Sequence, residues 1–163
     1  MSQRTSMVGH LPTLRSPVRV AAIGIAAVFL LFGVLGFIPL FVSDFDEFAF
    51  AGHESQAFLL GAFQVSAVHN LVHLAFGIAG VVFARTASGA RKFLIVGGLV
   101  YAVVWLYGLF VDFYSANNFL PVNVADNALH FLLAVAMLAT GLLLARVSTA
   151  RSDTETEPET EPG

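Results

Sequence analysis

Four residues of types that bind metal ions occur as two pairs with the same spacing. His69 and His73 are four residues apart, and Asp126 and His130 repeat that spacing. Residues four apart share one face of a helix, so each pair would present both side chains on the same side. If the two faces meet, three imidazoles and one carboxylate converge. This set of ligands suits zinc, iron or copper in a four-coordinate site.

A structural role explains the same residues equally simply. Ser66, Asn70 and Asn127 could orient metal ligands from behind, or could form polar contacts between helices. Asp126 follows Asn123 and lies where a helix N-cap belongs, so its carboxylate could accept backbone N–H groups. The sequence favours polar packing between helices over metal binding.

Other cofactors have less support from the sequence. His73 and His130 could act as the two axial ligands of a haem, but haem-binding membrane bundles usually offer more room. A quinone or lipid pocket lined by Tyr101, Trp105 and Tyr107 is a further alternative, although aromatic residues near the ends of spans usually anchor a helix at the interface. No cofactor is therefore predicted beyond the candidate transition metal.

The composition indicates that membrane helices must position these residues. Of the 163 residues, 57% are hydrophobic and only 12% are charged, with a net charge of −3. A soluble domain carries about twice that share of charge. These values exclude disorder and nucleic-acid binding for the body of the chain. The absence of cysteine excludes disulfides and thiolate metal sites.

Hydropathy predicts an all-α protein, a bundle of four transmembrane helices. A helix needs about 20 apolar residues to cross the hydrocarbon core. The apolar stretches that meet this length lie at about 20–42, 62–84, 93–111 and 127–145. Together they predict a membrane domain over residues 18–146. Residues 1–17 are expected as a cytoplasmic segment and 147–163 as a disordered acidic cytoplasmic tail.

The charged residues predict the topology. All eight basic residues lie before the first span, between spans two and three, or after span four; they are Arg4, Arg15, Arg19, Arg85, Arg91, Lys92, Arg146 and Arg151. The other two loops contain acidic residues instead. The positive-inside rule therefore predicts that both termini lie in the cytoplasm.

The two halves of the chain share a short pattern. His69-Asn70-x-x-His73 lies in the first half of the second span, and Asp126-Asn127-x-x-His130 opens the fourth, which favours two tandem helical hairpins of the same orientation. Small residues spaced by four, such as Ala75 and Ala79, and the pair Gly97-Gly98 are typical of close helix packing.

Several motifs together resemble a bacterial integral membrane protein family, the domain of unknown function 4383. The resemblance rests on residues 69–80, 84–86, 101–108, 116–123 and 125–130, and covers about 18–146. It implies four spans in the plasma membrane and implies no reaction.

The function predicted from the sequence is a non-enzymatic structural or accessory membrane component. The H-x-x-x-H pattern of His69 and His73 lacks the glutamate of a zinc protease, and no phosphate loop or catalytic triad is found. A metal- or cofactor-binding membrane protein is the first alternative. A small transporter or channel subunit that works as an oligomer is the second. The expected partners are the bilayer and a second copy or another membrane protein, and no nucleic acid.

Overall fold

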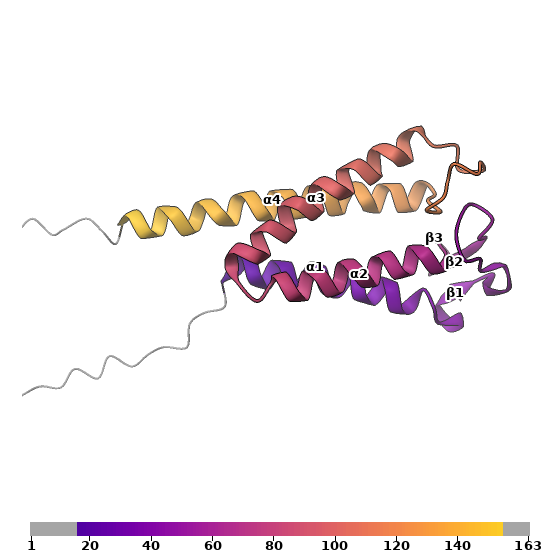
Figure 1. Ribbon diagram of the computed structural model, residues 1–163, viewed down its shortest axis with the longest axis horizontal. Helices are drawn as coiled ribbons and strands as arrows, with labels where there is room; N and C mark the ends of the chain where they lie inside the picture. Colours follow the sequence, from indigo (N-terminus) through magenta and orange to yellow (C-terminus); the bar gives the residue numbers. More distant parts are fainter. Residues whose placement is uncertain (1–15, 155–163) are drawn as a thin grey trace, which may run out of the picture.

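The computed structural model describes residues 16–154, with side chains as far as Leu144, and is mainly helical (Figure 1). Its four α-helices are α1 (Pro17–Leu35), α2 (Ala67–Phe83), α3 (Ala87–Phe110) and α4 (Val124–Thr154). Three of them, α1, α3 and the Val124–Leu144 part of α4, are long and apolar enough to cross a membrane. The fourth, α2, is apolar but shorter, with 17 residues. The predicted all-α class fits this architecture.

The helix ends differ from the predicted spans. The first stretch, expected to run to residue 42, is helical only to Leu35, where the N–H of Gly36 closes the last turn on the carbonyl of Phe32. Pro39 then begins a 3-10 turn. The second stretch becomes helical at Ala67 instead of residue 62. The last helix continues to Thr154, into the expected acidic tail; residues 1–15 and 155–163 lie outside the described residues.

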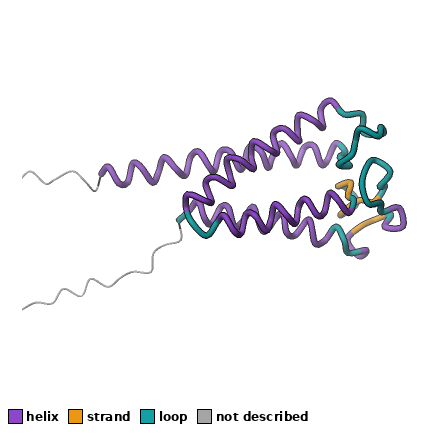
Figure 2. The backbone as a smooth tube through the Cα atoms, in the orientation of Figure 1, coloured by secondary structure: helices purple, strands orange, loops and turns teal. Residues whose placement is uncertain are grey.

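A small three-stranded sheet between α1 and α2 was not predicted. It consists of β1 (Val42–Ser43), β2 (Ala57–Leu59) and β3 (Phe63–Val65), with 3-10 turns η1 (Pro39–Phe41) and η2 (Phe45–Glu47) (Figure 2). The strands are antiparallel in the order β1-β2-β3, with Val42 opposite Leu59 and Ala57 opposite Val65. These four residues are buried together against Phe32 and Leu35 of α1. The sheet therefore caps one end of the helices.

The helices pack as two pairs, α1 with α2 and α3 with α4. Glycines allow the close approach within each pair. A β-carbon on Gly77 of α2 would lie 2.5 Å from the side chain of Leu30 of α1. A β-carbon on Gly98 of α3 would lie 2.8 Å from the side chain of Leu138 of α4. Larger residues at either position would push the helices of that pair apart.

The helix faces that carry the predicted site residues are the buried ones. On α2, His69, Asn70, His73, Gly77 and Gly80 are buried. On α4, the buried residues include Asp126, His130, Ala134 and Met137. Both helices therefore point the predicted site residues toward the interior of the molecule and away from its surface.

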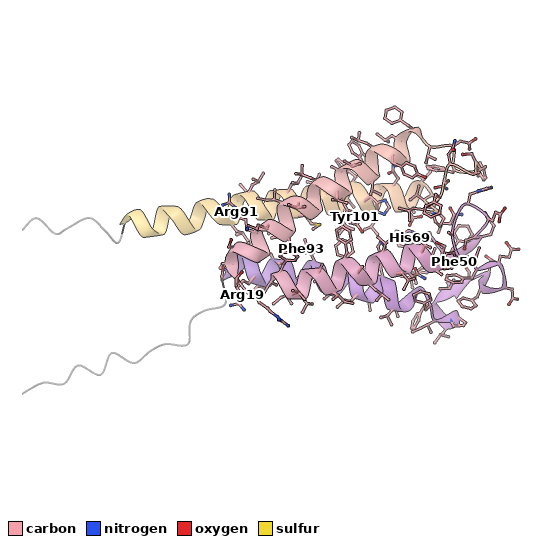
Figure 3. All side chains as sticks on the ribbon, in the orientation of Figure 1. Arg19, Phe50, His69, Arg91, Phe93 and Tyr101 are labelled. Atoms are coloured by element: carbon pink, nitrogen blue, oxygen red, sulfur yellow. The ribbon has the colours of Figure 1, made fainter. Side chains whose placement is uncertain are left out.

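Charge is divided between the two ends of the molecule. The basic residues Arg19 and Arg91 lie at the end opposite the sheet (Figure 3), and Arg19 Nε donates a 2.9 Å hydrogen bond to the carbonyl of Ala84. The acidic residues between Asp44 and Asp126 lie in 36–66, in the α3–α4 loop and at the start of α4, which meet at the sheet end.

Candidate functional site

Three of the four predicted ligands come together. His69, His73 and His130 are all buried, and one nitrogen from each imidazole lies within 4.8 Å of the other two. The ring centroids of His69 and His73 are 4.6 Å apart, and those of His69 and His130 are 6.2 Å apart. Among the described residues, all the candidate ligands in this cluster are imidazole nitrogens, and none is a carboxylate.

The ring of His69 is oriented by the loop that precedes α4. Its Nδ1 lies 3.0 Å from the carbonyl oxygen of Pro121. Since a carbonyl can only accept, Nδ1 carries the proton and donates it, and Nε2 keeps its lone pair. A hydrogen bond from one imidazole nitrogen to a backbone carbonyl is usual for a metal-ligating histidine.

The loop itself is held by a buried asparagine. Asn118 is fully buried; its amide donates to the carbonyls of Phe113 and Val122 at 3.0 and 3.1 Å and accepts from the N–H of Val122 at 3.1 Å. These three bonds fix the backbone on either side of Pro121. The position of the carbonyl that orients His69 is therefore determined by Asn118.

The three imidazoles border a cavity of about 170 Å³ between α2, α3, α4 and the α3–α4 loop. Its remaining wall is almost entirely apolar, with Phe76, Val100 and Val122 among the lining residues. Tyr101 also lines it, with its ring centroid 5.4 Å from that of His130 (Figure 3). The cavity is smaller than the ~300–1,000 Å³ of pockets for drug-sized ligands. An ion with one or two small ligands fits; a haem macrocycle does not.

One nitrogen of the cluster lacks a partner in the described part of the chain. Nδ1 of His130 is buried and accepts or donates no hydrogen bond there. A buried polar atom without a partner costs about 1–3 kcal/mol. A ligand that meets this atom would remove that cost.

Asp126, the fourth predicted ligand, is engaged elsewhere. Its Oδ2 accepts the N–H groups of Gln64 and Asn123, both at 3.0 Å. The side chain of Asn123 in turn accepts the N–H of Asp126 at 3.0 Å. The helix N-cap is thus Asn123, not Asp126, and the two residues form a reciprocal capping box. Through Gln64, the same carboxylate ties the sheet to the start of α4.

The three polar residues expected to support the site form no side-chain hydrogen bond to an imidazole ring in the part of the chain that the structure describes. Ser66 is the N-cap of α2, and its hydroxyl accepts the backbone N–H of His69 at 3.2 Å. The amide of Asn70 lies against Gly36, and that of Asn127 lies against Gly108. Both amides contain buried polar atoms without a partner among the described residues. These residues define the helix starts and the close contacts within each helix pair.

The two histidine-bearing helices begin alike. Counting from the N-caps Ser66 and Asn123, His69 and Asp126 occupy the third helical position and His73 and His130 the seventh. Corresponding asparagines approach a glycine at the C-terminal end of the preceding helix: Gly36, the C-cap of α1, and Gly108 in the last turn of α3. His73 and His130 are therefore the equivalent residues of the two pairs, and His69 has no histidine counterpart.

Some site residues could not be found from the sequence. The site also includes Phe76, Val122 and the carbonyl of Pro121. These are apolar side chains and a backbone group, which nothing in the sequence marks as functional. Tyr101 could be suspected from the sequence, because the hydroxyl of a tyrosine in the middle of a span usually has a polar neighbour.

Comparison with known families agrees with the motifs. A family model described as a domain of unknown function, DUF4383, matches residues 19–143. The match covers most of the chain, so the chain belongs to this family, as the sequence motifs predicted. No curated protein and no solved structure matches the chain.

Proposed function

We propose that this member of the DUF4383 family is a multi-pass membrane protein that binds one transition-metal ion through His69, His73 and His130. The observation that carries the proposal is the convergence of three buried imidazoles from two helices. Ionisable groups inside membrane spans are costly, so a cluster of three suggests a ligand.

The distances are compatible with one shared ion. A tetrahedral metal at ~2.0–2.1 Å from each nitrogen holds pairs of nitrogens about 3.4 Å apart. The three nitrogens lie within 4.8 Å of one another. Small rotations of the side chains about χ1 and χ2 close the remaining gap. The fourth position would face the cavity, next to Tyr101.

The ligand set limits the metal. Three imidazoles without thiolate or carboxylate suit zinc, copper or iron and disfavour calcium and magnesium, which take oxygen ligands. The bond from His69 Nδ1 to Pro121 supports ligation through Nε2. Asp126 is assigned to holding the sheet and the start of α4, because its Oδ2 already accepts two backbone N–H groups.

Metal analysis of the purified full chain tests the proposal. The protein is isolated in detergent with an affinity tag that contains no histidine, and its metals are measured by elemental mass spectrometry. We expect about one equivalent of metal per chain. His73→Phe and His130→Phe should abolish it. His53→Phe is the matched control, because His53 lies in the loop between α1 and α2 and outside the cluster.

Cobalt substitution separates loss of the site from loss of the fold. Visible absorption of bound Co²⁺ reports its coordination, while circular dichroism and size-exclusion chromatography report folding. If folded wild-type protein takes up no stoichiometric metal from micromolar zinc, copper, iron or cobalt, the proposal is wrong. The histidines would then serve packing between α2 and the α3–α4 loop, as the bond from His69 to Pro121 allows. That outcome would favour the structural or accessory role.

The proposed location is the plasma membrane, with the membrane domain over 18–146 and both termini in the cytoplasm. Support comes from Arg19, Arg85, Arg91 and Lys92, which lie at one end of the helices, since basic residues stay on the cytoplasmic side. At ~1.5 Å per residue, α2 is about 26 Å long, slightly less than the ~30 Å core. The sheet would then lie at the outer interface. Topology reporters at positions 50 and 88 should appear on opposite sides of the membrane.

A further inference from the structure

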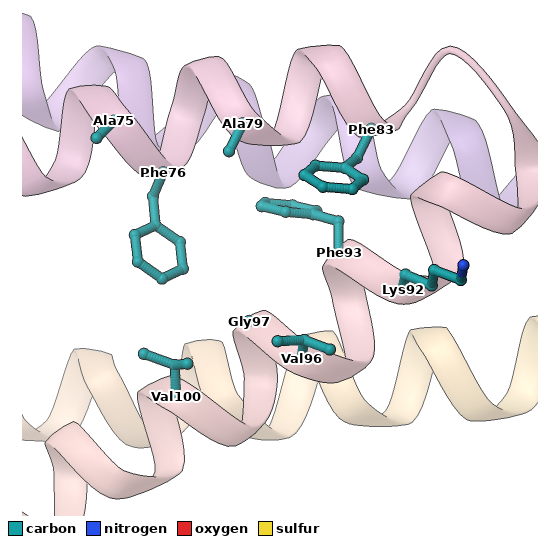
Figure 4. Close-up of a pocket in the computed structure, with 9 residues that line it drawn as sticks. All are labelled: Ala75, Phe76, Ala79, Phe83, Lys92, Phe93, Val96, Gly97 and Val100. Carbon is teal, nitrogen blue, oxygen red and sulfur yellow. The ribbon is translucent and has the colours of Figure 1, made fainter.

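A second cavity of about 500 Å³ lies between α2 and α3, outside the histidine site (Figure 4). We call it the interhelical groove. It exists because these two helices belong to different pairs and pack little against each other. Ala75 and Ala79 of α2, which the sequence suggested as packing residues, instead form part of its wall. Its volume is within the ~300–1,000 Å³ of ligand pockets.

The groove is apolar and borders the exterior of the molecule. All but one of its lining residues are apolar. Phe83 and Val96, one from each helix, are 49% and 59% exposed. In a bilayer these side chains would contact acyl chains. The groove therefore receives a hydrocarbon ligand from the side, without passage through water.

The one charged residue of the groove is Lys92, at its end near the α2–α3 turn (Figure 4). Lys92 is exposed and forms no ion pair or hydrogen bond with the residues that the structure describes. The acidic residues whose side chains the structure describes lie at the opposite end of the molecule. An anionic group at the groove end would therefore meet an ammonium that has no partner among these residues.

The length of the groove matches one leaflet. From Lys92 to Val100 the helix rises roughly 12 Å, and one leaflet contributes about 15 Å of hydrocarbon. An acyl chain that begins at the headgroup level beside Lys92 would thus end near the middle of the bilayer. There it meets Phe76 and Val100, which close the deep end of the groove.

We infer that the interhelical groove binds one acyl chain of an anionic phospholipid, with the headgroup phosphate at Lys92. The inference rests on the proposed membrane location but not on metal binding. The apolar wall accounts for binding of the acyl chain. The ammonium of Lys92, which has no partner among the described residues, accounts for the preference for a negatively charged headgroup. A partner's transmembrane helix in the same groove would bury the walls but would leave Lys92 without a counter-charge.

Native mass spectrometry of the full chain tests the inference. Delipidated protein in detergent is titrated with phosphatidylglycerol or with phosphatidylcholine of the same acyl chains. We expect one phosphatidylglycerol to be retained, with about fivefold higher affinity than phosphatidylcholine, the factor expected for one basic residue at an anionic membrane surface. Bound metal adds a separate mass in the same spectra, so failure of the metal proposal and failure of the lipid inference are read independently.

Two matched pairs of variants give the decisive comparison. Lys92→Gln should abolish the preference for phosphatidylglycerol, so that the two lipids bind about equally. The neighbouring Arg91→Gln, outside the groove, should keep the preference. Ala79→Phe should fill the groove and lower retention of both lipids, whereas Leu99→Phe, on an exposed face of α3, should not. Equal binding of both lipids by the wild type, or an equal effect of Lys92→Gln and Arg91→Gln, would overturn the inference. So would lipid retention unchanged by Ala79→Phe.

Discussion

Replacement of Phe29 by Ala should loosen the contact between the two helix pairs. Phe29 of α1 is 1% exposed, and its ring centroid lies 5.0 Å from that of Tyr101, 5.5 Å from that of Phe76 and 5.8 Å from that of His73. It therefore contacts α2 and α3 at once, directly beside the histidine cavity.

The magnitude follows from these ring contacts. In a soluble protein, Phe→Ala in the core costs about 3–5 kcal/mol, part of which is the transfer of the ring from water. In lipid this transfer contributes little, because acyl chains are as apolar as the protein interior. The loss of three ring contacts at ~0.5–1.5 kcal/mol each remains, so the free energy of unfolding should fall by about 1.5–4.5 kcal/mol.

Unfolding in mixed detergent micelles measures this loss. Trp105 is the only tryptophan, and its ring lies 4.9 Å from that of Phe131, so its fluorescence reports the α3–α4 pair. Phe110→Ala is the control, because Phe110 is 86% exposed. Phe29→Leu, which keeps most of the volume, should cost less than Phe29→Ala. If the losses of unfolding free energy in Phe29→Ala and Phe110→Ala agree within about 0.5 kcal/mol, the ring contacts of Phe29 do not stabilise the fold as expected.

Three further outcomes are expected. Asn118→Ala removes three hydrogen bonds to the α3–α4 loop and should release the carbonyl that orients His69. The affinity for metal, measured by chelator competition, should therefore fall about 10–100-fold. Unchanged affinity would contradict the role of Asn118 in orienting His69. Gly36→Ala should lower the free energy of unfolding by about 1–3 kcal/mol, because the new β-carbon would clash with the amide of Asn70. Adding Asn70→Ala should remove this clash and restore part of the stability. Gly24→Ala should be near neutral, because its β-carbon would have no neighbour within 4 Å. Asp126→Ala should lower stability by about 1–2 kcal/mol and leave the metal content at one equivalent; loss of metal in folded protein would make the carboxylate a ligand.

The helices were predictable from the sequence, but their ends were only partly so. Long apolar runs and the buried faces of α2 and α4 follow from hydropathy and helical spacing. Residues 36–42 are as apolar as the helix before them, so hydropathy alone could not separate the two. What ends α1 is Gly36, packed against Asn70, with Pro39 soon after. The sheet depends on contacts with Phe32 and Leu35 that no local pattern encodes.

The candidate site was predictable in its histidines and not in its geometry. The four-residue spacing placed His69 with His73, and the repeated pattern suggested His130 as a neighbour. Asp126 has the same spacing from His130, yet it caps the helix, because the third helical position directs its carboxylate back to the backbone N–H groups. A ligand and a cap have the same sequence signature at this position, so the capping contacts of Asp126 could be identified only from the structure.

The wall shared by the two cavities has a chemical consequence. Phe76 and Val100 border both the histidine cavity and the interhelical groove, so these two side chains belong to a wall that the two cavities share. In the proposed membrane location, a solute that dissolves in hydrocarbon would have a route to a bound ion across this wall. Along this route, partition into hydrocarbon would favour small uncharged molecules such as dioxygen over hydrated anions.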